Sequence, residues 1–126
     1  MENFVEKVWG SEEWIVNRQY CGKFLNLKKS YRCSMHHHKN KDETFFILKG
    51  KVLMEVDGKT KIMNIGDSQL IEPNQKHRFT GLKDSRILEI STHHEDGDSY
   101  RDEESGKVDL KELVRELNKS GIKDNL

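Results

Sequence analysis

The chain from about residue 14 to residue 92 consists of short runs in which apolar and polar residues alternate, separated by Gly, Asn and Asp. Alternation with a period of two is the pattern of a strand with one buried face, and helical periodicity is absent from this region. In KFLNLK, for example, Lys23, Leu25 and Leu27 share one face. The region therefore predicts an antiparallel β-sandwich or barrel.

Turn residues between these runs indicate how the strands connect. Asp57-Gly58 supplies the two residues tolerant of positive φ that a type I′ hairpin turn requires. Pro73-Asn74 fits the two central positions of a type II turn. His77 and Phe79 then begin another predicted strand.

The pattern changes beyond Thr92. HHEDGDSYRDEESGK is polar, contains two Gly, and predicts a loop over the barrel mouth. VDLKELVRELNKSG predicts a short amphipathic helix, with Asp109 as N-cap and Gly121 as stop. Its apolar stripe, spaced i, i+3, i+4, i+7, consists of Leu110, Leu113, Val114 and Leu117. We expect this stripe to pack on the barrel, with a dimer contact as the alternative.

The length and the net charge of the chain limit its domain organisation and the kinds of partner that it can bind. A chain of 126 residues predicts one domain, divided into a barrel over residues 1–105 and a helical appendage over 106–126. Lys plus Arg and Asp plus Glu both number 22, so there is no net charge to attract nucleic acid or a membrane. The charged start and the lack of a long apolar run predict a soluble, cytoplasmic protein, in which Cys21 and Cys33 are free thiols.

The stretch CSMHHHKNKDETFFILKG carries candidate metal ligands. If RCSMHHHK is extended, His36 and His38 share one face and His37 points the other way. A turn at KNKD would bring Glu43 back beside the pair on an adjacent antiparallel strand, and His77 offers a fourth ligand. Imidazole and carboxylate ligands suit Zn, Mn, Fe, Ni or Cu. The sequence thus predicts one divalent transition metal on His36, His38, Glu43 and His77.

The joint spacing of these residues resembles the two signature motifs of the cupin superfamily. His-x-His is followed by four residues, Glu43, six residues, Gly50, fifteen residues, Gly66, ten residues and His77. Ser30 and Asn74 stand where the family usually has Gly, and both departures affect turns. The resemblance implies an all-β antiparallel barrel or jelly roll (a double-stranded β-helix) with the metal inside, here followed by the short C-terminal helix.

A narrower resemblance covers about 100 residues through VWGSEEW, KFLNLKKS, DETFFILKGKV, PNQKHRF and DSYR. These segments are similar to the C-terminal domain of type II phosphomannose isomerases and to small cupin isomerases related to D-lyxose isomerase, which like this chain have His as first ligand. The resemblance implies a homodimeric aldose-ketose isomerase for a D-lyxose or D-mannose type sugar or a sugar phosphate. The reaction would pass through a metal-stabilised cis-enediol, with Mn first among candidate metals and Zn, Fe, Ni or Co as alternatives.

Such a reaction needs groups that bind the sugar and move a proton. Lys23 faces the barrel interior and is a candidate proton shuttle or oxygen ligand. Arg101 and Tyr100 would bind hydroxyls or a phosphate, with Asp98 orienting the arginine. We therefore assign catalytic roles to Lys23 and Arg101, and substrate contacts to Asp98, Tyr100 and Phe79.

The general base stays open between Glu72 and Glu89. We expect Leu88 and Ile90 to face inward, which leaves Glu89 exposed, although a polar barrel interior is the alternative. His93 and His94 occupy adjacent positions that point apart, so we expect no site role for them. Trp14 is interpreted as a packing residue, with sugar stacking as the alternative.

Two other functions compete with the isomerase. Three histidines and a glutamate also serve cupin dioxygenases that use Fe, Ni or Cu, so the ligand set cannot decide. A non-catalytic sugar-binding or metabolite-binding cupin is the second alternative, and no helix-turn-helix or basic patch supports a transcription factor. The polar candidates Lys23, Asp98 and Arg101 favour a sugar.

Overall fold

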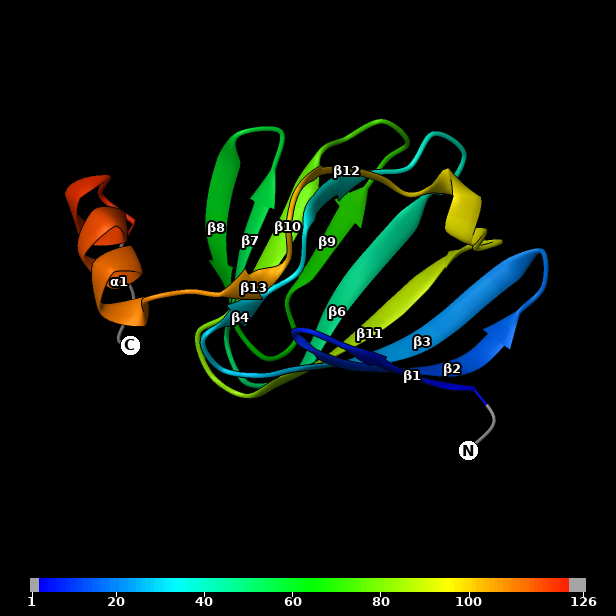
Figure 1. The fold of residues 1–126 in the computed structure, drawn as a ribbon, viewed down its shortest axis with the longest axis horizontal. Helices are drawn as coiled ribbons and strands as arrows, with labels where there is room; N and C mark the ends of the chain where they lie inside the picture. The colour runs from blue at the N-terminus through cyan, green and yellow to red at the C-terminus, as the bar shows by residue number, and fades with distance from the viewer. Residues whose placement is uncertain (1–2, 123–126) are drawn as a thin grey trace.

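The computed structural model describes residues 3–122 and has two antiparallel sheets with one short helix (Figure 1). The first sheet runs in the order β1 (Phe4–Lys7), β2 (Gly10–Asn17), β3 (Tyr20–Leu27), β11 (Ser85–Thr92), β6 (Glu43–Lys49) and β9 (Ser68–Ile71). The all-β prediction is confirmed, and the N-terminal hairpin β1–β2 extends the sheet along the edge of β3.

The second sheet carries the remaining strands. Its order is β12 (Tyr100–Glu103), β5 (Met35–His37), β10 (His77–Gly81), β4 (Tyr31–Arg32) and β13 (Gly106–Lys107), and β10 also pairs with β7 (Val52–Val56), which pairs with β8 (Lys59–Met63). Asp57 and Gly58 between β7 and β8 take φ values of 48° and 79°, as the predicted type I′ turn requires. Asn74 has φ 71° and Ser30 has φ 72°, so both adopt the left-handed conformation at positions where the family usually has Gly.

The core lies between the two sheets. Alternate residues of β3 are buried, so Lys23, Leu25 and Leu27 face inward as predicted. The main apolar cluster draws on both sheets and consists of Trp9, Leu25, Leu27, Cys33, Phe45, Ile47, Val52, Met54, Met63, Ile71, Phe79 and Ile87. Cys21 and Cys33 are buried free thiols, in agreement with the sequence.

The segment after β11 is more ordered than the sequence predicts. Instead of a continuous loop, it forms a 3₁₀ turn (η1, Asp96–Asp98) and then β12 and β13. β12 pairs antiparallel with β5, so that Tyr100 lies opposite His37 and Arg101 opposite His36. Strand pairing needs only backbone N–H and C=O groups, and this is why a polar segment can form an edge strand without an alternating apolar pattern.

The helix α1 (Leu110–Lys119) forms as predicted. The Asp109 side chain accepts a hydrogen bond from the backbone N–H of Glu112, and Gly121 follows the helix with φ 82°. Leu117 packs with Leu53 of β7 and Leu82, so the apolar stripe rests on the chain's own barrel beside β7 and β8 (Figure 1).

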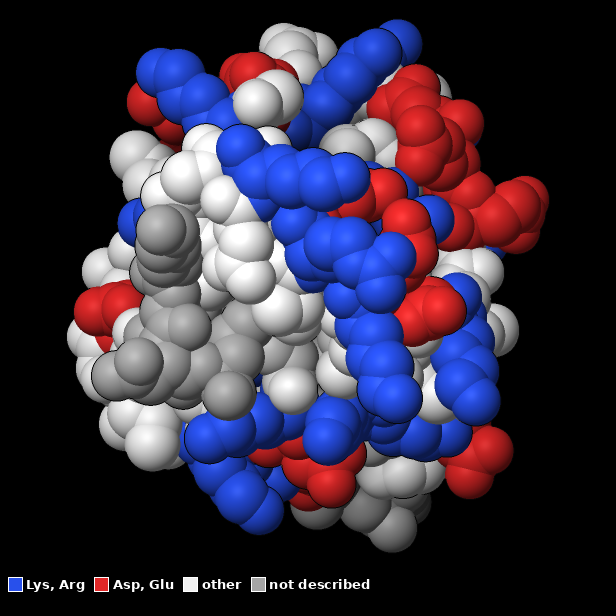
Figure 2. Space-filling view, turned by 90° about the vertical axis from the view of Figure 1, so that its left-hand side faces the viewer, with Lys and Arg blue, Asp and Glu red and all other residues white. Residues whose placement is uncertain are grey.

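The exposed side of α1 carries charges of both signs. Lys111 and Arg115 alternate with Glu112 and Glu116. Figure 2 shows Lys and Arg side chains next to Asp and Glu side chains over this end of the molecule. Within residues 3–122, no helix is long and apolar enough to cross a membrane.

Leu117→Ala should lower the free energy of unfolding by about 2–4 kcal/mol, because it removes buried methyl groups from the only contact cluster that joins helix and barrel within residues 3–122. Urea denaturation followed by circular dichroism measures the change. Lys111→Ala, on the exposed side of the same helix, is the matched control and should change little. Equal stability of the two variants would show that the helix does not dock as described.

Candidate metal centre

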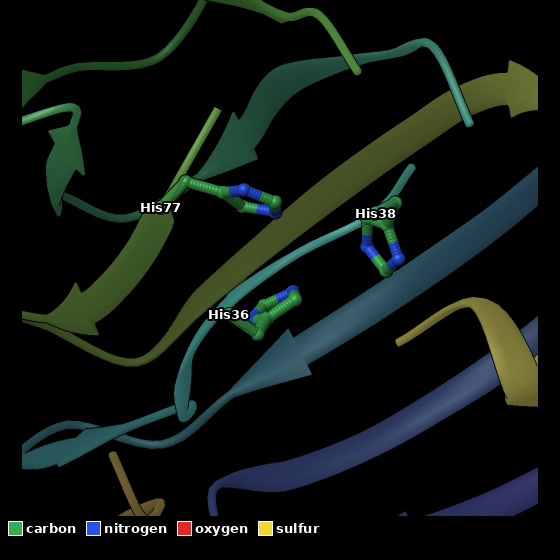
Figure 3. Close-up of side chains that lie close together, drawn as sticks. All are labelled: His36, His38 and His77. Carbon is green, nitrogen blue, oxygen red and sulfur yellow. The ribbon is translucent and has the colours of Figure 1, made fainter. Parts of the chain in front are cut away.

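Three histidine rings converge inside the barrel (Figure 3). His36 lies in β5, His38 directly follows β5, and His77 begins β10 opposite His36. One ring nitrogen from each residue lies within 4.8 Å of the other two. His37 points away and stacks on Tyr100 with 5.2 Å between ring centroids. The alternation predicted for His-x-His therefore holds.

Backbone carbonyls fix the tautomer of each ring. The Nδ1 atoms lie close to main-chain oxygens, at 2.7 Å from Ser34 for His36, 3.0 Å from Asp98 for His38, and 2.9 Å from Gln75 for His77. A carbonyl oxygen only accepts hydrogen bonds, so each Nδ1 carries a proton, and in the neutral ring Nε2 keeps a free lone pair. This is the arrangement that orients imidazoles for metal binding.

Glu43 reaches the histidines from the opposite sheet. The sequence predicts it on a strand adjacent to β5, but β5 pairs with β10 and β12, whereas β6 pairs with β11 and β9. The prediction of an adjacent strand was wrong because the KNKD segment crosses between the sheets instead of closing a hairpin. The result is a carboxylate that faces the histidines across the barrel.

The residues fit a divalent metal. Glu43 Oε1 lies 3.0 Å from His77 Nε2, and Oε2 lies 3.8 Å from His38 Nε2. His77 Nε2 is buried and has no hydrogen-bond partner within residues 3–122. Two buried electron-pair donors at this separation can share a proton or a metal ion, and three imidazoles with one carboxylate suit Mn, Fe, Co, Ni or Zn.

The protonation states also suit ligation. Burial, followed by the neighbouring His77 ring, lowers the pKa of His36 to about 3. Burial likewise lowers the pKa of His38. Burial raises the pKa of Glu43, but the His77 ring and the Lys41 ammonium outweigh it and hold that pKa below its ordinary value. At neutral pH, His36 and His38 are therefore neutral and Glu43 is ionised.

Lys41 is a buried charge that sequence reasoning missed. Its side chain is 3% exposed, and its Nζ lies 3.0 Å from Glu43 Oε2, 2.9 Å from Glu89 Oε2 and 3.0 Å from His94 Nδ1. The contact with Glu43 is an ion pair, and Glu43 Oε2 has no hydrogen-bond partner within residues 3–122. In the sequence, KNKD has the composition of any polar turn, so nothing in it indicates that Lys41 is buried.

Glu89 was predicted to be exposed, and this was wrong. Glu89 is 5% exposed, whereas Ile90 is 54% exposed. Two ammonium groups, Lys41 at 2.9 Å and Lys23 at 4.0 Å from Oε2, offset the cost of burying the carboxylate. The polar-interior alternative is the correct one, because β11 buries Glu89 and exposes an isoleucine.

Lys23 faces the interior as predicted and is 1% exposed. Its Nζ lies 3.7 Å from Glu12 Oε1 and 4.0 Å from the centre of the Trp14 ring. The Trp14 indole N–H donates to the same Glu12 oxygen at 3.0 Å. The N-terminal hairpin therefore supplies a carboxylate and an indole beside the lysine.

These groups line one cavity of about 520 Å³. Besides three of the predicted ligands, its lining includes Trp9, Glu12, Trp14, Lys23, Lys41, Phe45, Phe79, Glu89, His94, Ser99 and Arg101. His77 contacts the cavity residue Glu43 from behind this lining. Predicted site residues Lys23, Phe79 and Arg101 thus share a cavity with the histidine cluster.

Two predicted substrate contacts lie elsewhere. The Asp98 carboxylate accepts the backbone N–H groups of Lys39 at 2.9 Å and Asn40 at 3.1 Å, and its carbonyl holds His38. Tyr100 is 37% exposed and packs on His37 outside the cavity. Asp98 organises the turn after His38, and neither residue lines the cavity.

His94 lies in the cavity wall although the sequence gives it no role. Its Nδ1 contacts Lys41, and its Nε2 lies 2.9 Å from Asp96 Oδ1. Burial, followed by the charge of Lys41, lowers the pKa of His94 to about 4. His93 is directed to the Arg18 carbonyl at 2.8 Å, so only one of the adjacent pair reaches the cavity.

Solved structures share this fold. Ectoine synthase from P. lautus is 13% identical with a TM-score of 0.70, and the match covers 80% of this chain and 81% of that protein. KdgF from Halomonas sp. is 15% identical with a TM-score of 0.65, and the match covers 69% of this chain and 81% of that protein. A cupin-superfamily sugar phosphate isomerase from Silicibacter pomeroyi is 18% identical with a TM-score of 0.61, and the match covers 67% of this chain and 59% of that protein. At these identities the likeness is one of fold.

A search of curated proteins finds no match to the sequence. The family model described as a cupin domain, however, matches residues 24–91, which is more than half of the chain. The matched region runs from β3 to β11 and contains His36, His38, Glu43 and His77. The histidine cluster inside the two-sheet barrel agrees with this match, and the chain belongs to the cupin family.

Proposed function

We propose that this cupin is a divalent-metal-dependent isomerase that interconverts an aldose and a ketose, acting on a D-lyxose or D-mannose type sugar or on a sugar phosphate. The observation that carries the proposal is the position of Glu89, a buried carboxylate in the wall of the cavity that also holds the histidine cluster. Such a reaction requires a base that takes a proton from one carbon and returns it to the next.

A metal ion held by His36, His38, Glu43 and His77 would supply the Lewis acid that polarises the substrate carbonyl. The chain's own groups carry out the other tasks. They must move the proton, bind the hydroxyl groups and neutralise charge within the cavity. Each task has a candidate among the lining residues.

Glu89 has the environment of a proton carrier. Burial, followed by the charge of Glu43, raises the pKa of Glu89 above its ordinary value. Lys23, Lys41 and Ser91 all contact its Oε2 atom. A carboxyl with a raised pKa in the wall of the cavity suits reversible proton transfer. Glu89 is therefore the base of the proposal, in place of exposed Glu72.

The other charged groups favour a polyhydroxylated substrate. The Lys23 ammonium beside Glu89 would hydrogen-bond a substrate oxygen, and the Trp14 ring, which the same ammonium covers at 4.0 Å, positions that lysine in the cavity wall. Arg101 lines the cavity, and its guanidinium has no ion pair or hydrogen bond within residues 3–122. A free guanidinium binds a phosphate or neighbouring hydroxyls with two parallel hydrogen bonds. An apolar substrate would leave the Arg101 guanidinium unpaired and would offer no acceptor to Lys23.

Metal dependence is tested first with His38→Ala. The wild type should retain about one Mn²⁺, Zn²⁺ or related ion per chain and isomerise D-lyxose, D-mannose or mannose 6-phosphate, whereas His38→Ala should lose both ion and turnover because one of four ligands is gone. Elemental analysis and a ketose assay measure the two properties. His93→Ala, outside the cavity, is the matched control.

Full turnover in a metal-free His38→Ala protein would contradict the proposal. Bound metal without turnover on any of the three sugars would favour the alternatives of oxygen chemistry or ligand binding.

Glu89→Gln should lower turnover roughly 10²-fold or more while the ion is retained, since the amide cannot accept the substrate proton. Exchange of the sugar's C2 proton in D₂O, followed by NMR, measures the step directly. Glu72→Gln is the control, because Glu72 is exposed and lies outside the cavity lining. Normal exchange in Glu89→Gln would exclude Glu89 as the base.

The lowered histidine pKa values predict acid sensitivity of the metal-free protein. Unfolded histidine binds a proton below about pH 6.5, whereas folded His36 does not until about pH 3. Stability is therefore lost as the pH falls through this window, by up to about 1.4 kcal/mol per pH unit for one such histidine. Urea titrations in EDTA should show a shallower loss for His36→Gln, and parallel curves would refute the assignment.

A further inference from the structure

Lys41 is a constrained residue of the cavity that the proposed reaction does not use. Its three partners come from different places in the fold, since Glu43 begins β6, Glu89 lies within β11 and His94 follows β11. Three acceptor atoms surround its ammonium group at 2.9–3.0 Å, two of them carboxylate oxygens that form ion pairs with it. Asp96 holds His94 from the other side at 2.9 Å. Lys41 is therefore fixed in place.

In this arrangement the two oxygens of Glu43 have different partners. Oε2 lies 3.0 Å from Lys41 Nζ, whereas Oε1 lies 3.0 Å from His77 Nε2. A carboxylate with both oxygens free can bind a cation through one or both of them. Oε2 also lies 3.8 Å from His38 Nε2, but its pairing with the ammonium group leaves Oε1 as the oxygen better placed for an ion among the histidines.

We propose that Lys41 is a positioning residue that restricts Glu43 to a one-oxygen contact with the bound ion and thereby weakens metal binding. The inference rests on the metal site of the proposed function. It concerns how strongly the ion is held, and it is independent of the sugar and of the base.

Two physical effects act in the same direction. The ammonium repels a divalent cation bound to the same carboxylate. It also withdraws electron density from Glu43, so that the carboxylate neutralises less of the ion's charge. An ion held in this way binds less tightly and is a stronger Lewis acid.

Cobalt binding tests this role, because Co²⁺ reports its own ligands through its visible absorption. Titration with Co²⁺ alone, in competition with a chromophoric chelator, should show about tenfold or more tighter binding to Lys41→Met than to the wild type. The visible spectrum should also change, since Glu43 gains a second contact. Neither readout requires turnover.

Two further variants separate the contributions. Lys41→Met with Glu89→Gln removes one positive and one negative charge, so tighter binding there reports the release of Glu43 Oε2 rather than a change in net charge. The double variant also avoids an unpaired carboxylate at position 89 and keeps the test usable if the single variant does not fold. Lys23→Met is the matched control, because Lys23 is an equally buried ammonium that contacts Glu89 and Glu12 but not Glu43. It should keep the wild-type spectrum.

Unchanged or weaker Co²⁺ binding in both Lys41 variants, with a wild type that binds Co²⁺ normally, overturns this inference and leaves the proposed function intact. A wild type and variants that all fail to bind Co²⁺ overturn the metal site and the inference together. An infrared difference spectrum of the wild type with Zn²⁺ gives an independent result without substitution. The separation of its carboxylate stretches should match one-oxygen ligation, and a two-oxygen value would refute the role of Lys41.

Discussion

The contact between Glu43 and His77 is the constraint on which the interior depends. Their facing atoms lie 3.0 Å apart, and Nδ1 of His77 is directed to the Gln75 carbonyl, so Nε2 is the ring atom that meets the carboxylate and either a proton or a metal ion must lie between the two. Such a pair repels inside a barrel of low dielectric unless a cation compensates. Lys41 supplies one cation on one side of the carboxylate, and the ligand set fits a second on the other side. The fold concentrates acceptors here by bringing β6 and β10 together from opposite sheets.

Charges of alternating sign extend from this contact along one wall. Glu43, Lys41, Glu89, Lys23 and Glu12 follow one another at separations between 2.9 and 4.0 Å. Each buried charge faces an opposite one, which makes burial tolerable. β3 contributes to both halves of the interior, since Lys23 joins this wall and Leu25 and Leu27 join the apolar core. The barrel thus has a polar half suited to chemistry and an apolar half that stabilises the fold.

Much of this could be predicted from the sequence because local patterns encode it. The alternation of apolar and polar residues predicted the strands, Asp57-Gly58 predicted a turn, and the spacing of the histidines predicted that they cluster. The burial of Lys41 and His94 could not be predicted, since it depends on partners far apart in the chain. Glu89 alternates with buried Ile87, but the choice of that face depends on its distant partners Lys41 and Lys23. A lysine in a polar turn and a glutamate between leucine and isoleucine have no local mark of burial. β12 was not predicted, because an edge strand forms by pairing with the backbone of its neighbour and needs no alternating side-chain pattern of its own.

The pairing of β12 with β5 bears on how a ligand enters and leaves. Arg101 lies opposite His36 in that pairing, so the guanidinium and the histidine cluster are connected through adjacent hydrogen-bonded backbones. The segment bearing Arg101 cannot swing outward as a free flap without breaking that ladder and disturbing the strand that carries His36. The backbone at Arg101 is therefore held beside the cavity, while its exposed guanidinium keeps the freedom to turn toward a ligand.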